Sequence, residues 1–397
     1  MCERNLDFDT VPDRRGTKCL KYDFAVQRGR PADVLPLWVA DMDFKISSYI
    51  EDALAKQVQH GIYGYTETDD AYFAAVQHWI STRHGWQVQP EWLLKTPGVV
   101  FAIALAVKAC TQPGDAVLIQ QPVYYPFSEV ILDNGRRLVS NDLVLNEAAG
   151  KYEIDFADFE KKIVENGVKL FLLCSPHNPV GRVWTKEELV RLGHICQKHG
   201  VTVFSDEIHA DFVWKGKHQM FAAADPAFAQ FSITATSPSK TFNIAGLQTS
   251  NIFIPNESLR EKLRHALNAS GYSQLNAAGI IAAEAAYRDG GVWYDAVKEY
   301  LQKNIAYMKH FLESRLPQLK MIEPEGTYLV WVDCRALGLS AEKLDDLILH
   351  KAKLWLDSGA IFGTTGQGFQ RFNIACPRAT LTKALEQLEQ AVKSVTE

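Results

Sequence analysis

The stretch TKEELVRLGHICQKHGVTVF, residues 185–204, predicts a helix that leads directly into a strand. Thr185 is a good N-cap and Glu188 stands three residues later, as in a capping box. Gly200 occupies the position just after the helix, where glycine is favoured. Because the apolar run 170–173 precedes this helix, the segment predicts a β-α-β unit with a right-handed crossover. The apolar face of the predicted helix consists of Leu189, Leu192, Ile195 and Cys196.

Short apolar runs repeat on both sides of this unit. Those at 117–119, 233–235 and 252–254 are further predicted strands, separated by helical stretches. Such runs are typical of parallel strands that helices cover on both faces. The sequence therefore predicts an α/β fold whose large domain, over residues 48–290, holds a mostly parallel sheet between helices.

The last third of the chain has a different pattern. Residues 328–332 and 372–375 are predicted strands, and the chain ends in an amphipathic helix. We expect a smaller α+β domain over residues 291–397. The N-terminal segment 1–47 contains no β-α-β unit and is expected to pack on that domain.

Composition narrows the class of protein. The 397 residues are about two to three times a typical domain, which favours two lobes. A hydrophobic fraction of 47% excludes a disordered or collagen-like chain, and a net charge of -5 without basic clusters argues against a nucleic-acid partner. No run approaches the roughly 18 apolar residues of a membrane helix, and the N-terminus lacks a signal-peptide core. Seven scattered cysteines without a CxxC pair indicate reduced thiols in a cytoplasmic protein.

The turn Ser237-Pro238-Ser239-Lys240 carries the strongest chemical signal. It follows the predicted strand 233–235, and a lysine at the carboxyl end of a strand can form a Schiff base with an aldehyde if it is partly neutral. Ser237 and Ser239 can donate hydrogen bonds to a nearby phosphate. The alternative is a surface lysine in an ordinary Ser/Pro turn.

A second signal lies in the segment 204–211, directly after another predicted strand. Asp206 can pair with a protonated pyridine nitrogen and keep it charged. The alternatives are an N-cap for Asp206 and a satisfied, partly buried histidine for His209. A metal site would need a second ligand cluster at a recognised spacing, and none accompanies these residues, so no metal is expected.

Two turns complete the polar set. Asn178 follows the strand 170–173 and can donate to a phenolate oxygen, although Asn-Pro is also ordinary turn chemistry. Gly98 precedes an apolar helix that starts at Val99 and Val100, whose exposed backbone N–H groups favour a phosphate. Simple helix capping explains Gly98 equally well.

Aromatic residues gather in two further segments. Tyr124 and Tyr125 follow the strand 117–119, where a ring can lie on a flat cofactor. Tyr63 and Tyr65 stand in a short Gly-containing loop. Taken alone, both pairs are better explained as ordinary core or surface aromatics.

In this order, the segments resemble fold-type-I pyridoxal-5′-phosphate (PLP) enzymes of the class I/II aminotransferase superfamily, over nearly the whole chain. The resemblance implies that PLP is the cofactor and that Lys240 carries it. It implies that Asp206 pairs with the pyridine nitrogen, Asn178 contacts the ring oxygen O3′, and Tyr124 stacks on the ring. His209 stands where many aminotransferases have a tyrosine that touches this oxygen.

The resemblance also implies how phosphate and substrate are held. The phosphate would lie against the backbone of Val99 and Val100 and the hydroxyls of Ser237 and Ser239. Tyr63 would reach the phosphate of a partner subunit, which implies a homodimer with shared active sites. Arg371 would bind the substrate α-carboxylate, although a surface salt bridge is the simpler explanation without the family.

Two N-terminal segments point to one branch of the superfamily. Residues 14–23 and 37–44 resemble the signature of cystathionine β-lyases, or C–S lyases. Gln248 agrees with that branch, since most aminotransferases have a phosphate-binding arginine there. Ala40 and Tyr125 are expected beside the substrate. Small departures from the branch, which bear on the expected substrate but not on the cofactor, occur at Cys19, Ser175 and Gln219.

The resemblance thus implies a PLP-dependent carbon–sulfur β-lyase. Its substrate would be a small amino acid, cystathionine or a related cysteine S-conjugate, cleaved to pyruvate, ammonia and a thiol. Two alternatives stay open: an aminotransferase with the same cofactor, and a PLP-binding regulatory protein that acts through a protein partner.

Overall fold

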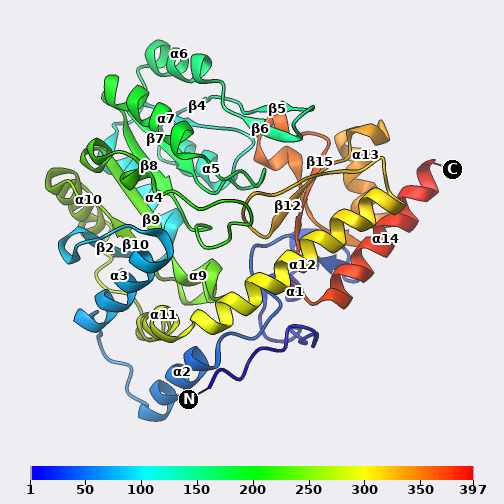
Figure 1. The fold of residues 1–397 in the computed structure, drawn as a ribbon, viewed down its shortest axis with the longest axis horizontal. Coiled ribbons are helices and arrows are strands. Elements are labelled where there is room, and N and C mark those ends of the chain that lie inside the picture. Colours follow the sequence, from blue (N-terminus) through cyan, green and yellow to red (C-terminus); the bar gives the residue numbers. More distant parts are fainter. Residues whose placement is uncertain (1, 397) are drawn as a thin grey trace.

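The computed structural model describes residues 2–396, and a seven-stranded sheet forms its centre (Figure 1). The strand order is β2-β10-β9-β8-β7-β3-β4, and the five strands from β9 to β4 are parallel. Their bounds are β2 Leu93–Thr96, β3 Ala116–Ile119, β4 Arg137–Ser140, β7 Leu170–Cys174, β8 Thr202–Asp206, β9 Ser232–Thr236 and β10 Ser250–Phe253. The predicted α/β fold with a mostly parallel sheet is confirmed.

One strand departs from the predicted parallel series. β10 runs antiparallel to both β9 and β2. The connection from β9 to β10 contains only the short helix α9 (Pro238–Thr241) and a single 3-10 turn, so the chain reverses direction without a crossover helix. This short reversal is the segment that carries Lys240.

The predicted β-α-β unit is present as β7-α7-β8. Helix α7 (Lys186–Lys198) begins with the capping box of Thr185 and Glu188. Its C-cap is His199, and Gly200 follows with a φ of 65°, a left-handed conformation that suits glycine. Because this helix returns the chain to the start of the sheet, β8 can pair with β7 in the same direction, and the two strands are adjacent and parallel.

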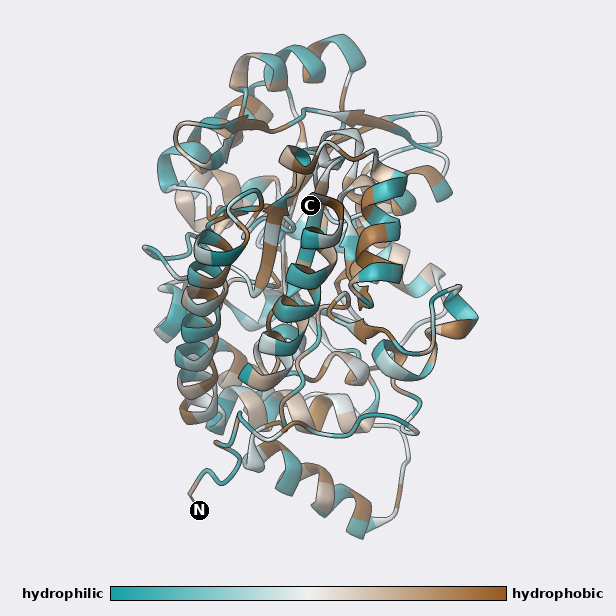
Figure 2. Cartoon of the chain, turned by 90° about the vertical axis from the view of Figure 1, so that its right-hand side faces the viewer, coloured by the Kyte–Doolittle hydropathy of each residue, from teal (hydrophilic) through white to brown (hydrophobic). Residues whose placement is uncertain are grey.

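Helices cover both faces of the sheet, as the all-apolar strands predict. Along β7, Leu170 and Leu172 pack into one core and Phe171 and Leu173 into another. On the side of the molecule shown in Figure 2, the surface helices are largely teal on their outer faces, and brown residues gather on the strands behind them. The first core includes residues of α4 (Val99–Cys110), α5 (Pro126–Asp133) and α10 (Glu257–Ala269), and the second includes residues of α6 (Phe156–Asn166) and α7.

A smaller antiparallel sheet, β11-β12-β15-β14, lies at the other end of the molecule, where the long helix α12 (Gly291–Arg315) runs beside α14 (Arg378–Thr396) (Figure 1). Its strands are β11 Lys320–Ile322, β12 Leu329–Asp333, β14 Asp357–Ser358 and β15 Phe369–Asn373. The N-terminal strand β1 (Leu35–Pro36) pairs in parallel with β13 (Leu354–Trp355). The expected domain boundaries, 47/48 and 290/291, stay a prediction.

The remaining elements complete the two lobes. Helices α2, α3 and α11 pack together beneath the large sheet (Figure 1). The bounds are α1 Leu20–Asp23, α2 Ser48–His60, α3 Asp70–His84, α8 Phe221–Ala224, α11 Ala277–Asp289, α13 Ala341–Asp346, β5 Val144–Asn146 and β6 Lys151–Glu153. Within residues 2–396, no helix is both long and apolar enough to cross a membrane.

Candidate active site

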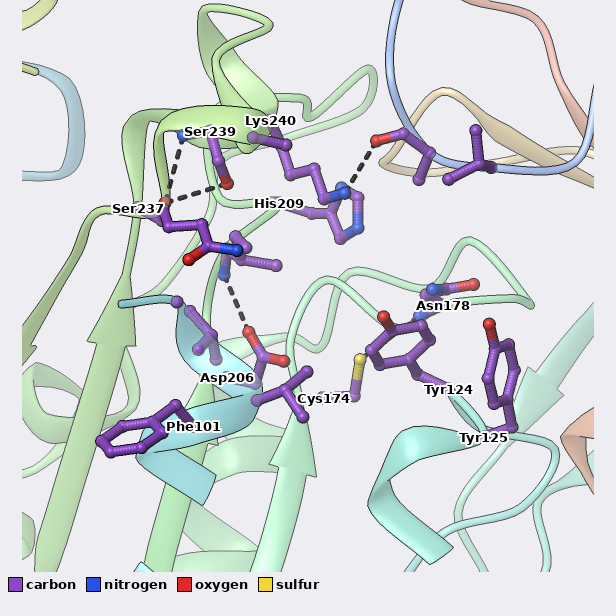
Figure 3. Close-up of a pocket in the computed structure, with 18 of the residues that line it drawn as sticks. Phe101, Tyr124, Tyr125, Cys174, Asn178, Asp206, His209, Ser237, Ser239 and Lys240 are labelled. Atoms are coloured by element: carbon purple, nitrogen blue, oxygen red, sulfur yellow. Dashed lines mark hydrogen bonds between the residues drawn. The ribbon is translucent and has the colours of Figure 1, made fainter. Parts of the chain in front are cut away.

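A cavity of about 310 Å³ opens at the carboxyl ends of β3, β7, β8 and β9. It brings together segments that are far apart in the sequence (Figure 3). Twelve of the thirteen residues that the sequence predicts for the site line it: Ala40, Val99, Val100, Tyr124, Tyr125, Asn178, Asp206, His209, Ser237, Ser239, Lys240 and Arg371. The exception is Tyr63.

Lys240 extends into this cavity from α9 (Figure 3). Its Nζ donates a hydrogen bond of 2.7 Å to the carbonyl oxygen of Ala40. Burial, the largest cause, and the charge of Arg371 together lower the pKa of Lys240 to about 8, against the opposing charges of Asp41 and Asp206. A substantial fraction of this amine is therefore neutral and nucleophilic near neutral pH.

Asp206 is the last residue of β8, and the strand register places it between Cys174 and Ala235. Its Oδ1 accepts a 3.2 Å hydrogen bond from the backbone N–H of Ile208, so the residue caps a turn and not a helix. Burial raises the pKa of Asp206 to about 7. A cationic ring nitrogen placed here would return the carboxyl group to its charged form.

Tyr124 and Asn178 are coupled through the backbone. The N–H of Tyr124 donates to the carbonyl oxygen of Asn178 over 3.0 Å. The two side chains lie close together beyond the carboxyl ends of β3 and β7 (Figure 3). Burial raises the pKa of the Tyr124 phenol, which therefore stays neutral at physiological pH. A neutral ring here can stack on a flat cofactor.

The opposite end of the cavity is suited to an anion. Gly98 has a φ of 112° and is the N-cap of α4, so the backbone N–H groups that follow it face the cavity without a capping side chain. Ser237 accepts a 3.1 Å bond from the N–H of Ser239 and donates over 2.7 Å to the carbonyl oxygen of Thr249. Gln248 also lines this end, and all of these donors are uncharged.

Arg371 occupies the wall formed by the small antiparallel sheet. Its Nη1 donates to Oδ1 of Asn178 over 3.0 Å, and its Nη2 donates to the carbonyl oxygen of Trp38 over 2.7 Å. Nη2 also pairs with the buried carboxylate of Asp357. Because Arg371 occupies Oδ1 of Asn178, the amide NH₂ of Asn178 is left to donate to a ligand.

Asp357 also lines the cavity, although the sequence did not predict it. The residue lies in the two-residue strand β14, directly opposite Arg371 in β15. Burial raises the pKa of Asp357, and the charge of Arg371 opposes this shift. The sequence offers no local signal for this carboxylate beyond its position in an apolar run; Trp38, another lining residue, was noted only within the N-terminal signature.

His209 is buried beside Lys240, with its ring edge-on to Tyr328 at 5.9 Å between centroids. Burial lowers its pKa well below the ordinary value, and Lys240 and Arg371 add to the shift, so the imidazole is neutral. Its Nδ1 has no hydrogen-bond partner among the described residues. Nε of Arg371 is likewise buried without a partner, so two polar atoms in this cavity are free for a bound molecule.

Tyr63 lies outside the cavity. Its side chain is 62% exposed, and the neighbouring Tyr65 is 98% exposed. Within this chain neither phenol belongs to the site. This placement leaves the expected contact with a partner subunit as a prediction.

The donor set fits PLP. Lys240 is an amine for its aldehyde, Asp206 is a carboxylate for its ring nitrogen, and Asn178 is an amide for its ring oxygen. The helix N-terminus at Gly98 and the nearby hydroxyls suit its phosphate. Within residues 2–396, no group of three or more histidine, cysteine or acidic side chains is arranged to hold a metal ion.

Comparisons with known proteins agree with this cofactor. The chain is 45% identical over 388 residues to cystathionine beta-lyase PatB of Bacillus subtilis, covering 98% of this chain and 100% of that one. It is 34% identical over 392 residues to protein MalY of Escherichia coli, covering 98% and 100%. The structure of cystalysin from Treponema denticola, which contains PLP, superposes with a TM-score of 0.94 at 38% identity, over 98% of this chain and 99% of that one.

A family model described as aminotransferase class I and II matches residues 33–388. This match spans both sheets and every lining segment of the cavity. The chain therefore belongs to the aminotransferase class I and II family and resembles its C–S lyases of the PatB and MalY type.

Proposed function

We propose that this protein is a PLP-dependent carbon–sulfur β-lyase that cleaves cystathionine or related cysteine S-conjugates to pyruvate, ammonia and a thiol. The observation that carries the proposal is the joint placement of Lys240, Asp206 and Arg371 in one cavity. The 45% identity to a cystathionine beta-lyase over nearly the whole chain supports the reaction type.

PLP, when bound, supplies an aldehyde for the substrate amine and a ring that accepts electrons from Cα. The protein supplies the rest. With PLP bound, Lys240 would act as the base for the substrate α-proton, a role that its lowered pKa suits. Arg371 binds the α-carboxylate and so fixes which bond at Cα is broken. Asp206 would hold its negative charge against the ring nitrogen, and Tyr124 would cover the ring.

We also propose a homodimer with shared sites in the cytoplasm. The loop around Tyr63 exposes a group of apolar and aromatic side chains that a partner could cover: Val58, Ile62, Tyr63 and Tyr65, exposed by 66%, 66%, 62% and 98%. All seven cysteines are free thiols, which supports a reducing compartment.

A product assay tests the proposal. Purified holoenzyme is incubated with cystathionine and no keto acid, with the Lys240→Ala variant as control. We expect pyruvate, ammonia and homocysteine in equal amounts over many turnovers, and none with the variant. Amino transfer that requires an added keto acid would instead establish an aminotransferase. The absence of both pyruvate formation and amino transfer would support a regulatory protein that binds PLP.

A further inference from the structure

Asp357 and Arg371 form a buried pair of opposite charge within the cavity wall. They stand directly opposite each other in the antiparallel strands β14 and β15. Their side chains are only 8% and 3% exposed. Both line the cavity. A substrate that binds Arg371 therefore also meets the carboxylate of Asp357.

A count of donors shows that the guanidinium of Arg371 can bind Asp357 and a substrate α-carboxylate at the same time. Arginine has five N–H groups. Three are used, by Asn178, Trp38 and Asp357. The two that remain include Nε, which is buried without a partner. The N–H of Nε can donate to one oxygen of an α-carboxylate while Nη2 stays bonded to Asp357, so substrate does not need to displace Asp357.

The charged side chains that line the cavity balance one another until a substrate carboxylate binds. The lining contains two basic side chains, Lys240 and Arg371, and two acidic ones, Asp206 and Asp357. With the cofactor bound, Lys240 and Asp206 are engaged by it. Arg371 then faces two carboxylates, those of Asp357 and of the substrate, which leaves one negative charge uncompensated in this buried wall.

The cavity wall near Asp357 contains no second cation: the charge of Arg30 lowers the pKa of Asp357, but Arg30 is exposed and does not line the cavity. This wall consists of Trp38, Val39 and Tyr125, which are apolar or aromatic. Asp357 acts on Tyr125, whose pKa burial raises and the charge of Asp357 raises further. The guanidinium of Arg28 lies 5.4 Å from the centre of the Trp38 ring, but Arg28 is exposed and does not line the cavity, so water screens its charge.

We propose that Asp357 is a specificity-determining residue that excludes substrates whose sulfur substituent carries an uncompensated carboxylate. Neutral substituents are accepted, and so are substituents that carry one ammonium and one carboxylate, such as the distal end of cystathionine. This inference rests on the proposed C–S lyase function and names the class of S-conjugate that the site takes.

The test compares two substrates of nearly equal shape, S-carbamoylmethyl-L-cysteine, which is neutral, and S-carboxymethyl-L-cysteine, which is anionic. We expect the native holoenzyme to prefer the neutral compound by at least about tenfold in kcat/KM. In Asp357→Asn the ratio should fall to below about threefold, because the repulsive charge is gone while an oxygen still faces Arg371.

The matched control is Asp345→Asn. Asp345 accepts a 3.0 Å hydrogen bond from Gln370, the neighbour of Arg371, and does not line the cavity. This variant should keep the native ratio. A second variant, Asp357→Ser, should also lose the discrimination and covers the case in which Asp357→Asn does not fold. The change in cofactor absorbance on adding L-aspartate or L-alanine gives a binding readout independent of turnover.

The outcomes separate the inference from the proposed function. S-methyl-L-cysteine is the neutral reference, and a native enzyme that makes no pyruvate from either cystathionine or S-methyl-L-cysteine contradicts the lyase itself. A native enzyme that cleaves S-methyl-L-cysteine but treats the two test compounds alike contradicts the role of Asp357. So does a preference that persists unchanged in both Asp357 variants.

Discussion

Lys240 donates a hydrogen bond from its Nζ to the carbonyl oxygen of Ala40, 2.7 Å away and 200 residues earlier in the chain. The hydroxyl of Tyr328 donates to the same oxygen over 3.2 Å. Asn373 holds the carbonyl oxygens on either side, those of Val39 and Asp41, at 2.6 Å each. The N-terminal segment that resembles the C–S lyase signature is therefore part of the cavity wall. Side chains from three distant positions hold its backbone carbonyl oxygens in place beside the cofactor lysine.

The lowered pKa of Lys240 predicts how cofactor loading depends on pH. With a pKa of about 8, about one amine in ten is neutral at pH 7, against about one in three thousand for an ordinary lysine. The rate at which apoprotein takes up PLP should rise with pH and level off above about pH 8. Stopped-flow measurement of the visible absorbance band checks this.

Borohydride reduction identifies the residue that carries the cofactor. After reduction, the label should lie on the single peptide that contains Lys240, and Lys240→Ala should stay colourless. A labelled lysine elsewhere would contradict the assignment, as would a loading rate that keeps rising beyond pH 10 as it does for an ordinary amine.

Asp206 predicts a pH dependence of stability in the apoprotein. Burial raises its pKa from the ordinary value of 3.8 to about 7, so between these values the folded chain binds a proton that the unfolded chain does not. The contribution of this group is fully present below pH 3.8 and is lost as the pH rises towards 7. The slope is at most about 1.4 kcal/mol per pH unit.

The comparison of apoprotein with Asp206→Asn isolates this group. The free energy of unfolding of the native apoprotein, relative to the variant, should fall from pH 4 to pH 7. In the holoenzyme the same variant should lower kcat by at least about a hundredfold, because the ring nitrogen loses its charged partner. Parallel stability curves for the two apoproteins would show that Asp206 keeps an ordinary pKa.

The sequence predicted most of the site because its signals are local. Each of Lys240, Asp206 and Asn178 stands next to the end of an apolar strand, and parallel strands bring such ends to one edge. Asp357 could not be found in this way, since its role depends on the register of the two-residue strand β14 against β15. The antiparallel direction of β10 could not be predicted for a related reason. An apolar run has the same composition whether its strand is parallel or antiparallel, and only the short connection before β10 indicates the direction of the strand.

Arg371 predicts a separable effect on substrate binding. Its charge also balances Asp357, so Arg371→Leu would leave a buried carboxylate unpaired and disturb folding. Arg371→Lys keeps the charge but loses the planar fork that holds a carboxylate. We expect kcat/KM for S-methyl-L-cysteine to fall at least about tenfold, with the PLP content unchanged. Loss of cofactor without a change in substrate affinity would place Arg371 at the phosphate instead.

The exposed loop around Tyr63 leads to a test of subunit sharing. Its phenol is 62% exposed and lies outside the cavity of its own chain, so a role in catalysis requires a second copy. Tyr63→Phe and Lys240→Ala should each be weakly active or inactive as homodimers.

In a mixed dimer, one site receives both a native Tyr63 and a native Lys240 if the tyrosine acts across the interface. Unfolding and refolding the two variants together should therefore restore up to about one quarter of native activity, since half of the dimers are mixed and each has one complete site. The matched control mixes Lys240→Ala with Tyr49→Phe, where Tyr49 lies on α2: each Tyr49→Phe subunit keeps a complete site in either kind of dimer, so activity should stay at about one half of native and not change on exchange. A monomer at assay concentration, or verified exchange without recovery in the Tyr63 mixture, would contradict the shared site.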